Sequence, residues 1–150
     1  MSLSSWEKFR ALTTLERLLL VEATCALAVA RLALLCFPFR WIAGWFGHAG
    51  SESGTTISSL KEAEARHVGR AVETMANHVP WKSLCLVKAI SAWWMLSRRG
   101  ITGTVYFGVA NDPCKSFSAH AWLRCGDRIV TGEKGYKQYR VLACFSKGER

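Results

Sequence analysis

The chain has 150 residues, half of them hydrophobic and only 21% charged, with seven tryptophans. This length predicts one domain over residues 1–150, and the composition excludes a chain that is disordered throughout, because enough apolar surface is present to form a core. The net charge of +9 favours an anionic partner such as nucleic acid, a membrane face or an acidic peptide, although a basic surface that only keeps the protein soluble fits equally well.

The six cysteines form no CxxC pair and no Cys/His cluster with the spacing of zinc ligands, so we expect no metal and no cofactor. Charged residues precede the first apolar run, and no clean small-residue cleavage site follows it. We therefore predict no signal peptide and a cytoplasmic localisation. In that reducing compartment the cysteines are expected to be thiols.

The first long element is a strongly apolar run over residues 14–37, which contains Glu22 and Arg31. A membrane span needs about 20 mostly uncharged apolar residues. The two charges therefore favour a buried helix over a transmembrane segment, with Thr13 or Thr14 as its N-cap and a proline that stops it.

Three further segments follow in the N-terminal half. Residues 37–47 mix aromatic residues with an arginine, and we predict core packing there, with a peripheral membrane or partner surface as the alternative. Residues 48–59 are rich in Gly, Ser and Thr without periodicity, which predicts a linker between an N-terminal helical part (1–47) and a core (60–150). Apolar residues at helical spacing then predict a helix over 60–78.

The C-terminal half begins with a predicted helix over residues 84–99, with Ser83 as its N-cap and Gly100 as its stop. Residues rich in β-branched and aromatic side chains come next, and the last two runs flank Gly126-Asp127 as in a hairpin. Strands are predicted at residues 102–109, 117–124 and 128–131. Helices followed by antiparallel strands indicate the α+β class.

Two residues in this half suggest nucleophilic chemistry. Cys85 lies in the first turn of its predicted helix, where unpaired backbone amides and the helix dipole favour a thiolate and could also line an oxyanion hole. His120 lies inside a predicted strand, which is a rigid support for a general base. A buried helical cysteine and a strand histidine bonded to backbone are each common without any catalytic role.

A third member can be argued from the hairpin. If Gly126 and Asp127 are its two central residues, His120 pairs with Glu133, and that carboxylate could fix the imidazole tautomer. Asp127 is the other candidate, but it sits at the hairpin tip, ~20 Å from His120 at ~3.3 Å per residue. A register shift of one residue would undo the assignment of Glu133.

These residues stand in a pattern that resembles a known family. Residues 78–109 (HVPWKSLCLVKAISAWWMLSRRGITGTVYFGV), followed by AHAW at 119–122, resemble the lasso-peptide leader peptidases, in the transglutaminase-like branch of papain-type cysteine proteases. The resemblance extends from about residue 9 to 145. It implies a nucleophile helix packed on a small antiparallel sheet, with Cys85 as nucleophile and His120 as general base.

The chain departs from the family pattern at two positions. The family usually has an acidic residue two positions after the tryptophan, where this chain has Arg124. The family's third catalytic residue is an aspartate about a dozen residues after the histidine, where this chain has Glu133. A glutamate accepts the same hydrogen bond, but its extra methylene changes the geometry.

The resemblance also implies substrate and partners. Such a protein removes the leader of a ribosomally made precursor peptide, and a separate ATP-dependent lasso cyclase then closes the ring. A separate leader-binding protein is expected as a partner, and no nucleic acid is. Two alternatives remain: a transglutaminase-like acyltransferase using the same cysteine and histidine, and a non-catalytic basic binding module.

Overall fold

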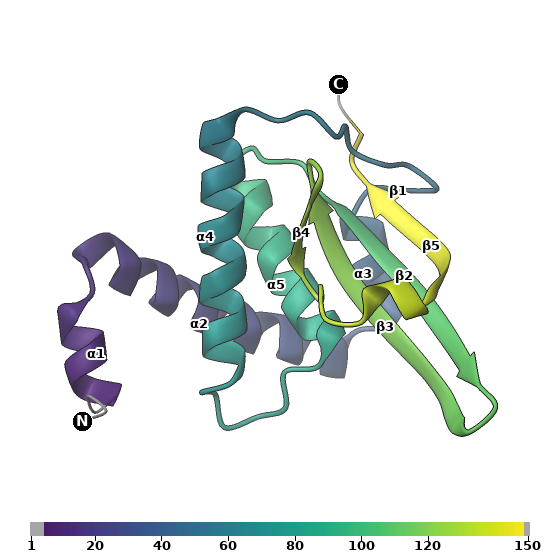
Figure 1. The fold of residues 1–150 in the computed structure, drawn as a ribbon, viewed down its shortest axis with the longest axis horizontal. Helices are drawn as coiled ribbons and strands as arrows, with labels where there is room; N and C mark the ends of the chain where they lie inside the picture. Colours follow the sequence, from purple (N-terminus) through teal and green to yellow (C-terminus); the bar gives the residue numbers. More distant parts are fainter. Residues whose placement is uncertain (1–4, 149–150) are drawn as a thin grey trace.

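A single antiparallel sheet with strand order β1-β5-β2-β3-β4 organises the protein, in a computed structural model that describes residues 5–148 (Figure 1). The strands are β1 (His48–Ala49), β2 (Thr104–Asp112), β3 (Lys115–Cys125), β4 (Arg128–Thr131) and β5 (Arg140–Ser146). The helices are α1 (Ser5–Ala11), α2 (Thr14–Cys36), α3 (Phe39–Trp45), α4 (Ser59–Ala76) and α5 (Cys85–Arg98), with a 3-10 turn, η1, at Tyr136–Gln138. The α+β class predicted from the sequence is confirmed.

The start of α2 follows the predicted chemistry. Thr13 is the N-cap, and it forms a capping box in which its hydroxyl accepts the Glu16 N–H at 3.3 Å and its own N–H donates to the Glu16 carboxylate at 2.8 Å. This helix packs on both α4 and α5. Within the described residues, α2 is also the helix that is long and apolar enough to cross a membrane, a test that core helices pass as well.

The prediction that α2 is buried is wrong for one side of it. Its small residues Ala23, Ala26 and Ala30 are buried against the other helices, whereas Leu32 on the opposite side is 59% exposed. Ile42 of α3 and Phe46, the residue after that helix, are in the core as predicted, but Trp41 and Trp45 are exposed. A helix with a small-residue seam packs closely along that seam, and its large residues are left outside.

The predicted linker at residues 48–59 is not a loose connection. Its first residues form β1, which pairs with β5. Ser53 is buried, and its N–H donates to the Thr104 hydroxyl at 2.8 Å. Arg124 donates to the Ser53 carbonyl at 3.1 Å and pairs with Glu52 at 3.2 Å. The polar residues of this segment therefore hold it against the end of the sheet through hydrogen bonds.

The two faces of the sheet carry different side chains. Val105, Ala121 and Leu123 turn toward the helices and join one hydrophobic core with them. Because side chains alternate along a strand, Tyr106 and Trp122 occupy the outer face, where their rings stack at 5.6 Å. His120 shares this outer face, since it lies two residues before Trp122.

Candidate active site

Cys85 is the first residue of α5. The N-cap is Leu84, without a side-chain cap, so the prediction that Ser83 caps this helix is wrong. The thiol is partly buried and packs against the hydrophobic core. Nearby in sequence, the indole nitrogen of Trp81 and the hydroxyl of Ser83 are buried, and within the described chain neither has a hydrogen-bond partner. Unsatisfied donors next to a helix N-terminus suit an incoming carbonyl oxygen.

The His120 ring is held from one side by a main-chain carbonyl. Its Nε2 lies 2.8 Å from the Gly132 oxygen. A carbonyl only accepts hydrogen bonds, so Nε2 carries a proton here, and in the neutral ring it is Nδ1 that has the lone pair. The ring also stacks on Tyr139 at 4.9 Å and on Trp122 at 5.8 Å. These contacts fix both the tautomer and the plane of the imidazole.

The predicted partner Glu133 does not stand opposite His120. The two-residue turn is present, since Cys125 pairs with Arg128. Farther from the turn the register shifts by one residue, so that Leu123 pairs with Thr131. Continued in that register, residue 133 lies opposite 121. The predicted pairing of His120 with Glu133 is therefore wrong, and the bulge that shifts it leaves no trace in the turn sequence. Glu133 is exposed, and its catalytic role stays a prediction.

A carboxylate of α4 that the sequence did not single out, Glu73, holds the segment that contains Gly132. Glu73 accepts the Gly132 N–H at 3.3 Å and pairs with Lys88 of α5 at 2.9 Å. Lys88 is one helical turn after Cys85. A chain of contacts thus runs from α5 through Glu73 and Gly132 to the ring of His120. No periodicity could have singled out Glu73, because the contact joins residues 59 positions apart.

Cys85 lies on α5 and His120 on β3, and these two elements pack together. Among the described residues, no hydrogen bond joins the thiol to the ring. Cys85 faces the helical core, whereas His120 lies on the outer face of β3. A catalytic pair can tighten only when substrate is bound, so this arrangement leaves a Cys–His mechanism open.

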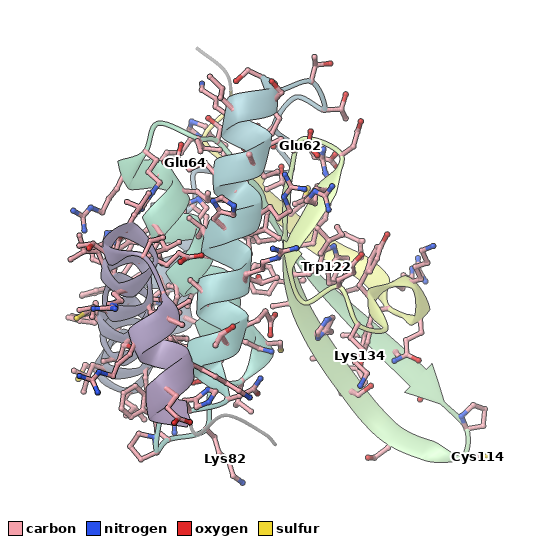
Figure 2. The ribbon with its side chains drawn as sticks, turned by 60° about the vertical axis from the view of Figure 1, so that its left-hand side comes forward. Glu62, Glu64, Lys82, Cys114, Trp122 and Lys134 are labelled. Atoms are coloured by element: carbon pink, nitrogen blue, oxygen red, sulfur yellow. The ribbon has the colours of Figure 1, made fainter. Side chains whose placement is uncertain are left out.

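The remaining cysteines lie in other environments. Burial raises the pKa of the Cys125 thiol, and burial likewise raises that of Cys144, so both favour the unreactive thiol form. Cys25 and Cys36 are exposed on α2, and Cys114 is at the tip of the β2–β3 hairpin, far from the helices (Figure 2). Figure 2 also labels Glu62 and Glu64 on α4 and Trp122 on β3.

Comparison with known proteins gives one match. The model of the transglutaminase-like superfamily matches residues 33–144, a stretch that contains both Cys85 and His120. No curated protein and no solved structure matches the chain. The matched stretch begins within the C-terminal half of α2 and ends in β5.

Proposed function

Because the chain belongs to the transglutaminase-like superfamily, whose members are typically Cys-His proteases or acyltransferases, we propose that it is a cysteine protease acting on a precursor peptide. The finer proposal is that it removes the leader of a lasso-peptide precursor, a role that the motifs around Cys85 and His120 suggest by resemblance. The observation that carries the proposal is a cysteine at the N-terminus of α5 together with a histidine on β3, the strand that packs on this helix, whose ring is oriented by the Gly132 carbonyl.

The chemistry would run through a thioester. Nδ1 of His120 accepts the proton of Cys85, and the sulfur attacks the scissile carbonyl carbon to form a tetrahedral intermediate. The C–N bond then breaks as the imidazolium returns the proton to the leaving amine, which leaves an acyl-enzyme. Water, deprotonated by the same imidazole, attacks the acyl carbon and releases the carboxylic acid and the thiol.

The first experiment tests the nucleophile. Cys85→Ala should abolish cleavage of the precursor, because it removes the sulfur that forms the thioester, while far-UV circular dichroism stays unchanged. Serine variants of Cys25, Cys36, Cys114, Cys125 and Cys144 serve as controls and should keep most of the activity. Cleavage at the normal rate by Cys85→Ala would refute the proposal. Product mass separates hydrolysis from transfer to an amine, which would instead indicate an acyltransferase.

The second experiment concerns partners, which we propose are a separate leader-binding protein and an ATP-dependent cyclase in the cytoplasm. Among the described residues, the sheet and helices α2 to α5 share a single core, and we identify no second module that could hold a leader. The protein alone should therefore cleave the precursor slowly, and adding the leader-binding protein should raise the rate at subsaturating precursor. Equal rates with and without that protein would contradict this division of labour.

A further inference from the structure

The outward side of α2 and the neighbouring part of α3 form a continuous apolar surface, which we call the α2–α3 face. On α2 it comprises Leu18, Val21, Val29, Leu32 and Leu35, which are each more than half exposed along one side of the helix. They are three residues apart, except for an interval of eight between Val21 and Val29 that contains exposed Cys25. On α3 it continues with Trp41, 57% exposed, and Trp45, 47% exposed. Single exposed apolar residues need no explanation, but a contiguous patch of this kind marks an interaction site.

From Val29 onward, the charged residues along this face have one sign. No Asp or Glu occurs between residues 23 and 51, a stretch that contains Arg31 and Arg40. The nearest acid before it, Glu22, points inward, where both its oxygens accept hydrogen bonds from Arg99 at 2.9 and 2.6 Å. From Val29 onward the face is therefore apolar, rich in tryptophan and flanked by Arg31 and Arg40, whereas Glu16 lies near Leu18 at its N-terminal end. An apolar helix side with cations beside it is the composition of a helix that lies at an anionic membrane surface.

A cavity opens between α2, α3 and α5 beside the same surface. It has a volume of about 370 Å³, and its walls include Val29, Trp45 and Trp94, so the α2 and α3 parts of the face adjoin there. Lys147 also lines it, with Nζ 5.1 Å from the centre of the Trp93 ring. An apolar cavity with an ammonium group in its wall suits an acyl chain whose anionic headgroup stays outside.

We propose that the α2–α3 face binds the surface of a bilayer that contains anionic lipid. The helix α2 lies along the surface and does not cross it, because its other side is fixed to the protein by buried Ala23 and Leu27 and by the Glu22–Arg99 pair. A second copy of the chain is a poorer occupant, since two such faces would bring Arg31 and Arg40 of both copies together. This proposal does not depend on the catalytic function.

The test is flotation with vesicles of neutral phosphatidylcholine, with and without phosphatidylglycerol, at low and high salt. The protein should float with the anionic vesicles at low salt and much less with the neutral ones. Arg31→Gln together with Arg40→Gln should weaken partitioning by about 25-fold, at about fivefold per cation. Leu32→Glu together with Trp41→Glu should abolish it. Quenching of tryptophan fluorescence by brominated lipid gives an independent readout of insertion.

Leu60→Glu is the matched control, because Leu60 is 82% exposed but lies on α4, away from this face. That variant should bind vesicles like wild type, and circular dichroism should show all variants folded. Three results would overturn the proposal: no flotation with either vesicle, equal loss in the Leu60 control, or self-association in light scattering that Leu32→Glu removes without any vesicle binding. The last result would assign the face to a second copy.

Discussion

The orientation of the His120 ring depends on a glycine whose side-chain space is occupied. At Gly132, with a φ of +77°, a Cβ atom would lie 2.7 Å from the Ala121 oxygen. The strand end therefore approaches β3 closely enough for its own carbonyl to reach Nε2 of His120. A main-chain carbonyl fixes the tautomer as a carboxylate does, but it carries no full charge to stabilise an imidazolium. For the orientation of the ring, the position in which this carbonyl is held therefore matters more than the charge that it carries.

We predict that Glu73 is a positioning residue for the His120 ring. Glu73→Ala removes the acceptor of the Gly132 N–H and the partner of Lys88, so the carbonyl loses its fixed place. We expect kcat for precursor cleavage to fall about tenfold, with the acid limb of the pH–rate profile displaced, whereas KM changes little. Glu73→Gln should restore much of the rate, because its amide oxygen still accepts the same hydrogen bond.

Two other glutamates provide the control for this prediction and the test of the alternative orienting group. Glu62→Ala, on the same helix but paired with Arg128, should leave the pH profile unchanged. Glu133→Gln distinguishes the two ways of holding the ring: it should behave like wild type if Gly132 is the orienting group. If Glu133→Gln loses most of its activity while Glu73→Ala keeps the wild-type rate, the orienting group is the Glu133 carboxylate, as predicted from the hairpin.

Between elements, the strongest polar connection joins α2 to the end of α5. Glu22 and Arg99 form a bidentate pair, and their side chains are only 22% and 23% exposed. Hydrogen bonding from Arg99 lowers the pKa of the Glu22 carboxyl below its ordinary value of 4.5. A carboxyl with a lowered folded pKa stabilises the fold fully above its unfolded pKa, and the stabilisation is lost as the pH falls through the folded value.

We therefore predict that Glu22→Gln lowers the free energy of unfolding by about 2 kcal/mol near neutral pH. The deficit relative to wild type should persist down to about pH 5 and shrink below about pH 4.5, where wild type loses the same interaction. Urea unfolding at a series of pH values measures it. Glu62→Gln breaks an exposed pair and should cost less than about 0.5 kcal/mol. A deficit independent of pH would show that packing, not charge, is responsible.

The N-terminal helices and the sheet share one core, although the sequence suggested a division at residues 48–59. Leu27 of α2 is fully buried in the same cluster as Val105 of β2. Phe46 lies against Trp93 at 5.0 Å and against Phe145 at 6.4 Å, so it joins α5 to the last strand. The superfamily match, which begins at residue 33, covers only part of this cooperative unit.

Accordingly, a fragment of residues 60–150 should not fold alone. It lacks Leu27, Ile42 and Phe46, which are each 0% exposed, and their loss uncovers the inner surface of α5. The fragment should show no cooperative thermal transition and should aggregate, whereas a chain that lacks only the first 11 residues should melt near the temperature of wild type. A cooperative transition in the 60–150 fragment would establish an independent core.

The sequence predicted elements better than contacts. The ends of α2, α4, α5 and β4 lie within two residues of those predicted from local signals, although the predicted Ser83 cap of α5 is wrong. What failed depended on distant partners: the exposed side of α2, the fastening of residues 48–59 by Thr104, and the bulge that moves Glu133 away from His120. The candidate nucleophile and base were identified by type and position, but only the folded chain relates them to Glu73 and Gly132.

The fastening of residues 48–59 also restricts how the molecule can move. With Ser53 bonded to Thr104 and Glu52 to Arg124, no hinge exists where the composition changes. The outer part of the β2–β3 hairpin is different: beyond Val109 its described pairs join only these two strands, and Figure 1 shows the tip extending past the rest of the sheet. His120 lies inside this boundary, because its partner Gly108 also pairs with Val141 of β5. Bending of the tip would therefore leave the imidazole in place, and the largest motions are expected at the tip and not between two domains.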